Sequence, residues 1–406
     1  MSKKGRSFII DYGCCLPYGH NLHAVNLYKR KEEARGKKAI AIVCKRVKSF
    51  HNKKQEGFYF LLPTLHKGLI IEAIDNFFIR LYMKLIRIIL LFPFIGKNNI
   101  LTIKGANSMK KLFKTLDINL EDTIIYPSAD YYGTKALLKT LSKLKVEDQP
   151  KVHLRFIGSL ETPHSFSNHH LPELIDLMQK NPHNLSVSAE VPIYARYLNS
   201  LIPNINVTAA PFPIEEKENV EKKEISKNNK NFTILLPGSN RADKGYFETY
   251  YLVKEILYEF PSVKVIIQDM KKQNKFFNKK YQNKLQNLAN VKLKEAVLAK
   301  EEILEMYNEA DLILLPYDPN VYHLRGSGIH YEAIENRIPV LAKKGVGFAE
   351  EIEEWFSGWL YETKQDLLQH LKKIMTLSSK EKEEQMHEAY RKYKKSSDEA
   401  YPFNLS

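Results

Sequence analysis

The sequence predicts an α/β protein built from two domains of repeated βα units, on three observations. Short apolar runs alternate with helical patterns along the whole 406-residue chain, which is typical of parallel sheets covered by helices. A chain of this length exceeds what one hydrophobic core normally supports. Residues 212–231 contain almost no apolar side chains and are predicted to be a solvated linker. The predicted domains are therefore residues 1–211 and 232–377, followed by a C-terminal helix over 378–406.

The predicted strands are short apolar runs, each bounded by turn residues or by a helical pattern. In the first domain they are 8–10, 39–44, 57–63, 123–126, 152–158, 186–190 and 205–210. In the second domain they are 232–236, 263–268, 290–294, 312–315 and 338–342. The C-terminal helix begins at a possible capping box, Ser378 to Glu381, and its apolar residues then recur at helical spacing.

A Gly-Ser-Gly turn over residues 326–328 follows the strand at 312–315 and opens a short helix. The N–H groups of Ser327, Gly328 and Ile329 are predicted to be the unpaired donors of that helix, whose N-terminus carries about half a positive charge and favours phosphate. One turn further in, Glu332 is placed to accept hydrogen bonds from a ribose. The alternative is an ordinary loop-to-helix junction with a surface glutamate.

A second turn of the same type follows the strand at 232–236. It contains Gly238, then Arg241 and Lys244, before Gly245 and a helix. Arg241 offers a planar fork and Lys244 a point charge, and both suit phosphate oxygens. Because ligands bind beyond the carboxyl ends of parallel strands, two such turns together predict a nucleotide diphosphate site.

These residues resemble the glycosyltransferases of the GT-B fold, which have two Rossmann-like domains facing a central cleft. The resemblance is to the group 1 type, similar to bacterial polysaccharide and lipopolysaccharide glycosyltransferases, and it covers residues 231–360 best. It implies that Gly238, Arg241, Lys244, Ser327 and Gly328 hold the diphosphate of a nucleotide-sugar donor. It also implies that Glu332, Val297 and Leu298 contact the donor ribose and base.

The chain departs from this family at two places. Many relatives have a glutamate eight residues before the second one, where this chain has Leu324. The glycine that usually follows the helix is Arg337, and Asn336 is expected to supply the left-handed conformation that a helix end needs. Neither change affects the predicted diphosphate site.

The N-terminal loop resembles the glycine-rich acceptor-side loop that begins GT-B chains. It contains Gly13 and Gly19 and ends at His20, whose neutral imidazole could take a proton from an acceptor hydroxyl. The alternative is that His20 caps the helix or faces solvent. Asp130, beyond the strand at 123–126, is a second candidate catalytic residue, with an Asx turn as its alternative.

Charge and cysteine usage set the expected environment. The chain has three cysteines and no secretory signal, which predicts a cytoplasmic protein, possibly at the inner face of the membrane. Its net charge of +15 suits anionic lipid or nucleic acid, but no nucleic-acid motif is present and none is expected as a partner. Residues 77–94 combine a basic helical face with apolar residues, which predicts peripheral membrane contact or, alternatively, a core helix.

The predicted function is transfer of a sugar from a nucleotide-diphosphate sugar to a glycan or lipid-linked acceptor, by a metal-independent hexosyltransferase. No cofactor is expected beyond the nucleotide-sugar co-substrate, and no spacing predicts a metal site. Two alternatives are open. One is a sugar-nucleotide epimerase on the same fold, and the other is a non-catalytic basic binding protein.

Overall fold

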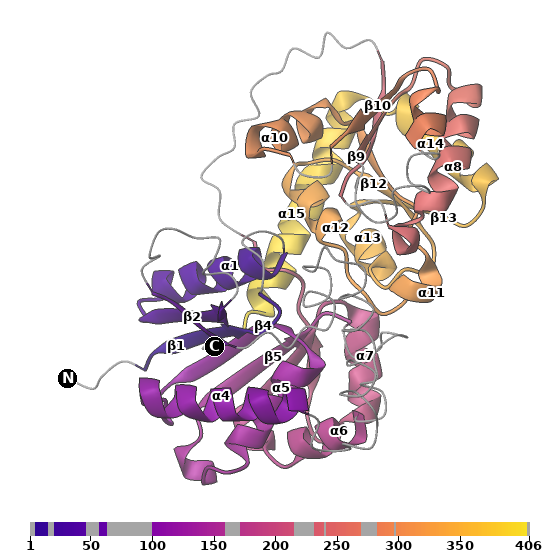
Figure 1. Cartoon of the computed structure of the whole chain (residues 1–406). Coiled ribbons are helices and arrows are strands. Elements are labelled where there is room, and N and C mark those ends of the chain that lie inside the picture. Colours follow the sequence, from indigo (N-terminus) through magenta and orange to yellow (C-terminus); the bar gives the residue numbers. More distant parts are fainter. Residues whose placement is uncertain are drawn as a thin grey trace. The chain divides into compact units, whose positions relative to one another are not determined.

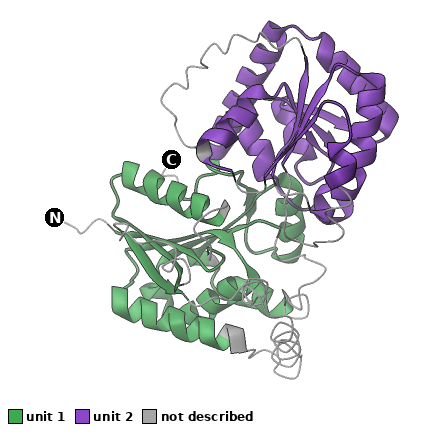
Figure 2. Cartoon of the chain, turned by 45° about the horizontal axis from the view of Figure 1, so that its top comes forward, with its two compact units in different colours: residues 1–215, 399–406 green, residues 216–398 purple. Residues whose placement is uncertain are grey.

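The computed structural model describes residues 5–14, 20–45, 57–62, 100–158, 171–214, 231–238, 241–268, 282–295 and 298–403. The chain forms two compact units, residues 1–215 with 399–406 and residues 216–398 (Figure 2). Each unit contains one parallel β-sheet with helices packed against it, which confirms the predicted α/β class (Figure 1). Each sheet with its helices forms a Rossmann-like layer structure.

The first sheet has the strand order β3-β2-β1-β4-β5-β6-β7, and its paired strands are parallel. Its strands are β1 (Ser7–Asp11), β2 (Ala39–Cys44), β3 (Phe58–Leu62), β4 (Thr123–Ala129), β5 (Lys151–Phe156), β6 (Leu185–Ala189) and β7 (Val207–Ala209). Its helices are α1 (His20–Ala34), α4 (Ile100–Leu116), α5 (Tyr131–Leu141), α6 (Leu171–Gln179) and α7 (Pro192–Leu201). In Figure 1, α1 covers one face of this sheet, and α4 and α5 cover the other.

The second sheet has the order β10-β9-β8-β11-β12-β13, again with parallel pairs. Its strands are β8 (Thr233–Leu236), β9 (Lys264–Gln268), β10 (Val291–Lys294), β11 (Leu312–Leu315), β12 (Val340–Lys343) and β13 (Gly358–Tyr361). Its helices are α8 (Tyr246–Glu259), α10 (Lys300–Glu309), α11 (Pro319–Tyr322), α12 (Gly328–Glu335), α13 (Ala349–Trp355), α14 (Lys364–Thr376) and α15 (Ser379–Glu399).

Burial explains why the central strands are easily read from the sequence. Every residue of β2, β8 and β11 is buried, so these strands are covered on both faces and appear as continuous apolar runs. The edge strand β13 was not predicted, because three of its four residues are only partly buried and it starts with glycine. That glycine is required, since a Cβ on Gly358 would lie 1.9 Å from the Val340 carbonyl oxygen.

Helix α15 starts at the predicted capping box. The backbone N–H of Ser378 donates to Glu381 Oε2 at 2.8 Å, and the Glu381 N–H donates to Ser378 Oγ at 3.2 Å. Met386, Ala389 and Tyr393 are fully buried within the second unit, where the Tyr393 ring stacks on Tyr331 with centroids 5.3 Å apart. The helical stripe read from the sequence is thus a packing surface.

The chain then returns to the first unit at residue 399. The Tyr401 ring stacks on Tyr28 of α1, with centroids 5.4 Å apart. Arg35 donates hydrogen bonds to the carbonyl oxygens of Pro402 and Phe403 at 3.3 and 2.8 Å. The segment 399–403 is therefore part of the core and surface of the first unit.

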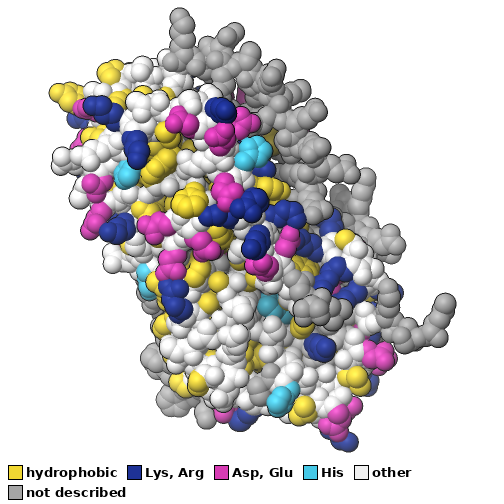
Figure 3. Space-filling model, turned by 180° about the vertical axis from the view of Figure 1, so that it is seen from behind, with side chains coloured by type: hydrophobic (Ala, Val, Ile, Leu, Met, Phe, Trp, Pro, Cys, Tyr) yellow, Lys and Arg dark blue, Asp and Glu magenta, His cyan; other side chains and the backbone are white. Residues whose placement is uncertain are grey.

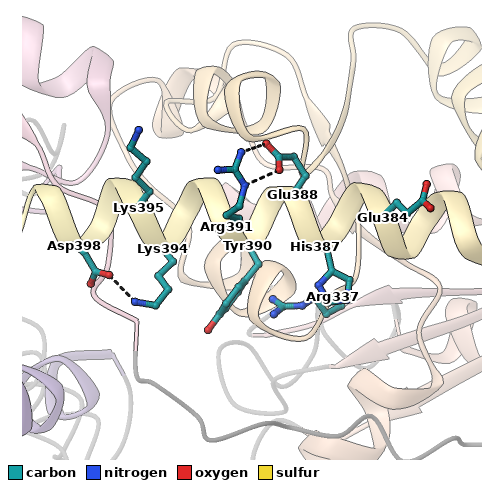
Figure 4. Close-up of a pocket in the computed structure, with 9 residues that line it drawn as sticks. All are labelled: Arg337, Glu384, His387, Glu388, Tyr390, Arg391, Lys394, Lys395 and Asp398. Atoms are coloured by element: carbon teal, nitrogen blue, oxygen red, sulfur yellow. Dashed lines mark hydrogen bonds and ion pairs between the residues drawn. The ribbon is translucent and has the colours of Figure 1, made fainter.

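The expectation that Asn336 takes the left-handed conformation after α12 is wrong. Asn336 has a φ of −90°, and the next residue, Arg337, has a φ of 59°. Figure 4 shows the Arg337 side chain beside Tyr390 of α15, with the guanidinium carbon 3.5 Å from the ring centroid. This cation–π contact offsets part of the cost of a left-handed non-glycine residue.

No helix in the described part of the chain is both long and apolar enough to cross a bilayer. On the face shown in Figure 3, several Lys and Arg side chains lie close together near the centre of the view, with Asp and Glu side chains among them.

Candidate functional site

The best candidate site in the second unit lies where its strand order changes direction. Strands β8 and β11 are paired neighbours, and the chain runs outward from them to β9 and β10 on one side and to β12 and β13 on the other. The loops that leave the carboxyl ends of β8 and β11 diverge there and leave a crevice in which ligands of open α/β sheets bind. Both predicted phosphate turns follow these two strands.

The turn after β8 has a backbone that only glycine adopts readily. Gly238 has a φ of 83°, and its N–H donates to Gln268 Oε1 at the end of β9, at 2.7 Å. A Cβ on Gly238 would lie 3.3 Å from Ile329 Cδ1 and 3.5 Å from Lys244 Nζ. The glycine turn, the Lys244 ammonium and the first turn of α12 therefore converge at one place.

Arg241 is held by two side chains that the sequence did not identify. Its Nε and Nη2 donate to the Asp243 carboxylate at 3.0 and 2.7 Å, and Nη2 also donates to the Tyr322 hydroxyl at 3.1 Å. Burial acts to lower the pKa of Arg241, but Tyr322 and Asp243 outweigh it, and the pKa is raised. The guanidinium is thus charged and held in place through its Nε and Nη2 atoms.

Lys244 supplies a second positive charge. Its ammonium lies 5.1 Å from the centroid of the Tyr317 ring, and no carboxylate of the described residues lies within ion-pair distance of it. Burial lowers the pKa of Lys244, and the neighbouring Arg241 charge acts in the same direction. A bound anion would stabilise the charged form of Lys244, so the position suits a phosphate.

Helix α12 begins as predicted. Ser327 is its N-cap, and the Ser327 carbonyl accepts the first helical bonds, from His330 and Tyr331 at 3.0 and 3.3 Å. The N–H groups of Gly328 and Ile329 come before those bonds and so have no partner within the helix. The Ile329 side chain lies beside the Gly238 turn, so the start of α12 is next to the turn that follows β8.

Glu332 lies one turn into α12 and is half-buried. The Tyr307 hydroxyl of α10 donates to Glu332 Oε2 at 2.6 Å. Burial raises the pKa of Tyr307, and the negative charge of Glu332 acts in the same direction. One Glu332 oxygen is thereby oriented. Leu298, half-buried, comes just before α10, and Val297 lies outside the described residues.

His330 of α12 has a structural role. It is fully buried, its Nε2 lies 2.8 Å from Ser357 Oγ, and its ring stacks on Trp355 with centroids 5.8 Å apart. Burial lowers the pKa of His330 to about 3, so the ring is neutral at ordinary pH. This histidine holds α12 against α13 rather than facing a substrate.

The surface groove along α15 is a separate feature. Figure 4 shows it lined by Arg337, His387 and Tyr390, with Arg391 paired to Glu388. Arg337 follows the C-terminal end of α12, whereas the phosphate turn precedes its N-terminal end, about 12 Å away for a helix of eight residues. The groove is therefore at the opposite edge of the sheet.

The first unit has an equivalent point, between the paired strands β1 and β4. Asp130 follows β4 and is the N-cap of α5. It accepts hydrogen bonds from the Gly133 N–H at 2.9 Å and from the Tyr126 hydroxyl. The predicted Asx-type contact and the strand-end position are thus both present.

Asp11, the last residue of β1, was missed in the sequence analysis although it has the same strand-end position. It is fully buried and accepts from the Cys14 N–H at 2.9 Å and from Asn21 Nδ2 at 3.3 Å. Burial, with the Asp130 charge acting in the same direction, raises the pKa of Asp11 to about 8. Asp11 therefore links Cys14, just after β1, to Asn21 in the first turn of α1.

Two features singled out in the sequence, Gly19 and the segment 77–94, lie outside the described residues. His20 is the first residue of α1, but its side chain is not among those described. Among the side chains that are described, no group of three or more His, Cys, Asp or Glu residues is arranged to hold a metal ion.

Comparison with known proteins identifies the second unit. Residues 217–393 match the family model of glycosyl transferases group 1, a range that contains both phosphate turns and Glu332. No curated protein matches the chain.

Several solved structures resemble the chain over nearly its whole length. A glycosyltransferase from Rickettsia africae aligns with a TM-score of 0.62 and 11% identity over 98% of this chain and 95% of that one. HepE from Anabaena, solved in complex with UDP, aligns with a TM-score of 0.62 and 13% identity over 97% and 98%. The N-terminal domain of Candida albicans trehalose-6-phosphate phosphatase aligns with a TM-score of 0.63 and 15% identity over 97% and 95%.

At these identities the structural likeness shows the fold alone. The sequence resemblance implied two Rossmann-like units, and the structure has them, the second of which contains the residues that match the group 1 model. The chain therefore has the GT-B fold, and its residues 217–393 match the glycosyl transferases group 1 family.

Proposed function

We propose that the chain transfers a sugar from a nucleoside-diphosphate sugar, bound by the second unit, to a glycan or lipid-linked acceptor. The observation that carries the proposal is the convergence of Gly238, Lys244 and the N-terminus of α12 beyond β8 and β11. Backbone N–H donors, an ammonium and an arginine fork around one glycine turn fit the oxygens of a diphosphate. The UDP complex of HepE supports a nucleoside diphosphate as the donor group.

In this proposal the same groups assist departure of the diphosphate. Arg241, Lys244 and the N–H groups at Ser327 and Gly328 neutralise the charge that develops on the leaving oxygen, so the mechanism invokes no metal ion. The Glu332 carboxylate, oriented by Tyr307, accepts hydrogen bonds from the ribose. Val297 and Leu298 are proposed to lie against the base.

The acceptor is proposed to bind at the carboxyl ends of β1 and β4 in the first unit. His20 would take the proton of the acceptor hydroxyl, and Asp130, at the end of the adjacent strand, is the second candidate for this role. Asp11 supports this proposal, because its hydrogen bonds to Cys14 and Asn21 hold a carboxylate at the end of β1, beside the start of α1.

If the acceptor is linked to a lipid, we propose that the protein contacts the anionic cytoplasmic face of the membrane that holds it. Helix α4, which follows the amphipathic segment 77–94 in the chain, has no acidic residue. It carries four exposed lysines: Lys104, Lys110, Lys111 and Lys114. None of these four forms an ion pair with a described residue. Each cation near an anionic leaflet contributes about 1 kcal/mol of attraction.

Thermal unfolding in the presence of nucleoside diphosphates and their sugars tests the donor proposal. A ligand that binds only the folded state raises the melting temperature by an amount set by its concentration over its Kd. With the best donor, release of nucleoside diphosphate should then depend on added acceptor. Acceptor-independent conversion of the sugar would identify an epimerase instead, and no shift with any nucleotide would contradict the proposed donor site.

A further inference from the structure

Tyr322 contacts two arginine side chains at once. It is the last residue of α11, and only 5% of it is exposed. Its hydroxyl accepts from Arg241 Nη2 at 3.1 Å, and the guanidinium carbon of Arg325 lies 5.8 Å from its ring centroid. One phenol therefore brings together a residue of the β8 loop and a residue of the β11 loop.

The Tyr322 ring is itself fixed from several sides. It packs on Tyr317 with centroids 4.5 Å apart, and its backbone carbonyl accepts from the Gly347 N–H at 2.7 Å. A Cβ on Gly347 would lie 2.7 Å from the Arg325 backbone nitrogen. The loop that carries Tyr322 and Arg325 is thus packed against residues 346–348 without room for a side chain at Gly347.

The charges around Tyr322 are only partly compensated. Asp243 pairs with Arg241, whereas no carboxylate of the described residues lies within ion-pair distance of Arg325. Burial raises the pKa of Tyr322 to about 12, so its hydroxyl is neutral and orients Arg241 without cancelling a charge. A guanidinium held on an aromatic face and left without a carboxylate is suited to an anionic ligand.

We propose that Tyr322 is a positioning residue for the donor, holding Arg241 and Arg325 as a guanidinium pair, and that Arg325 is a further donor-binding residue. This inference rests on the proposed function, because it assumes that Arg241 contacts the diphosphate. It adds that the β11 loop supplies a cation of its own through Arg325, next to Lys244 and Arg241 of the β8 loop. Tyr322 acts through the arginines and need not touch the ligand.

A double-mutant cycle tests the inference by calorimetric titration of the full chain with UDP, GDP, ADP and CDP. Tyr322→Phe keeps the ring and removes only the hydroxyl. We expect it to lower the affinity for the tightest-binding nucleotide by roughly 3- to 10-fold. In the Arg241→Ala background the same change should have no further effect. Arg325→Gln should weaken binding by roughly 10-fold, and Arg391→Gln, on exposed α15, is the matched control.

Two results would overturn the inference while leaving the donor site in place. In the first, Arg241→Ala weakens nucleotide binding but Tyr322→Phe does not. In the second, Tyr322→Phe weakens nucleotide binding by the same factor in wild type and in Arg241→Ala. Arg325→Gln that binds like wild type would remove Arg325 from the site. Failure of wild type to bind any of the four nucleotides would instead contradict the proposed function, and the inference with it. Ligand-free melting curves verify that each variant is folded.

Discussion

The Arg337 guanidinium carbon lies 3.5 Å from the centroid of the Tyr390 ring, and the backbone of Arg337 is left-handed. A side chain at this φ costs about 1 kcal/mol or more relative to glycine, and the contact with α15 offsets part of that cost. The end of α12 is thereby tied to α15 in the second unit. Helix α12 begins after its N-cap Ser327 and contains Glu332, so this contact holds the far end of the helix that carries the proposed donor residues.

The left-handed conformation predicts an order of stability for two variants. Arg337→Ala loses the Tyr390 contact and keeps the strained backbone, whereas Arg337→Gly loses the contact and relieves the strain. The free energy of unfolding, measured by urea titration, should therefore be about 1 kcal/mol higher for the glycine variant than for the alanine variant. Tyr390→Leu isolates the ring contact. An alanine variant as stable as the glycine variant would show that the backbone at 337 is unstrained.

Asp11 predicts a specific pH dependence of stability. Its folded pKa of about 8 lies above the ordinary aspartate pKa of 3.8, so the folded state binds the extra proton between these values. The free energy of unfolding contributed by this group therefore falls as the pH rises from about 4 to 8. Asp11→Asn should remove that fall, so its stability relative to wild type should be higher at pH 8 than at pH 5.

Urea titrations at several pH values, followed by circular dichroism, measure this difference for Asp11→Asn. Asp176→Asn, on the exposed face of α6, is the control and should show no such trend. If the free energies of unfolding of Asp11→Asn and wild type differ by the same amount at pH 5 and pH 8, Asp11 is ionised in the folded protein over this range.

Glu332 separates ligand recognition from folding. Glu332→Gln keeps the shape and one carbonyl oxygen that can accept from Tyr307, so the melting temperature should change little. Loss of the carboxylate should weaken the ribose contact and narrow the difference in affinity between UDP and its deoxyribose analogues. If the ligand-free melting temperature falls strongly instead, Glu332 has a structural role.

Membrane contact is tested by sedimentation with vesicles. Changing Lys104, Lys110, Lys111 and Lys114 to Gln should reduce binding to anionic vesicles, because their combined attraction is electrostatic and screened by salt. A second variant, with Arg80, Lys84 and Arg87 changed to Gln, tests the segment 77–94. Nucleotide binding should be unchanged in both. Equal sedimentation of wild type with anionic and neutral vesicles would exclude an electrostatic contact of this kind.

The sequence predicted the strands that are buried on both faces, and with them the two-sheet fold, because such strands are continuous apolar runs. It also placed Gly238, Lys244 and Ser327 beyond strand ends. It could not identify Tyr322, Asp243 or Tyr307, because these act through contacts between separate loops and helices that have no local pattern. Asp11 has a strand-end position and was detectable by the reasoning applied to Asp130. The edge strand β13 and the left-handed Arg337 depend on tertiary packing.

We propose that the β8 loop and the start of α12 bind a nucleoside diphosphate. The decisive measurement is calorimetric titration of UDP and GDP into wild type, Arg241→Ala and Lys244→Ala, with Arg391→Gln as the control. We predict that each of the first two variants loses about 1.5 to 3 kcal/mol of binding free energy and that the control loses none. Unchanged affinity in both variants, with melting curves like wild type, would contradict the assignment of this loop to the donor site.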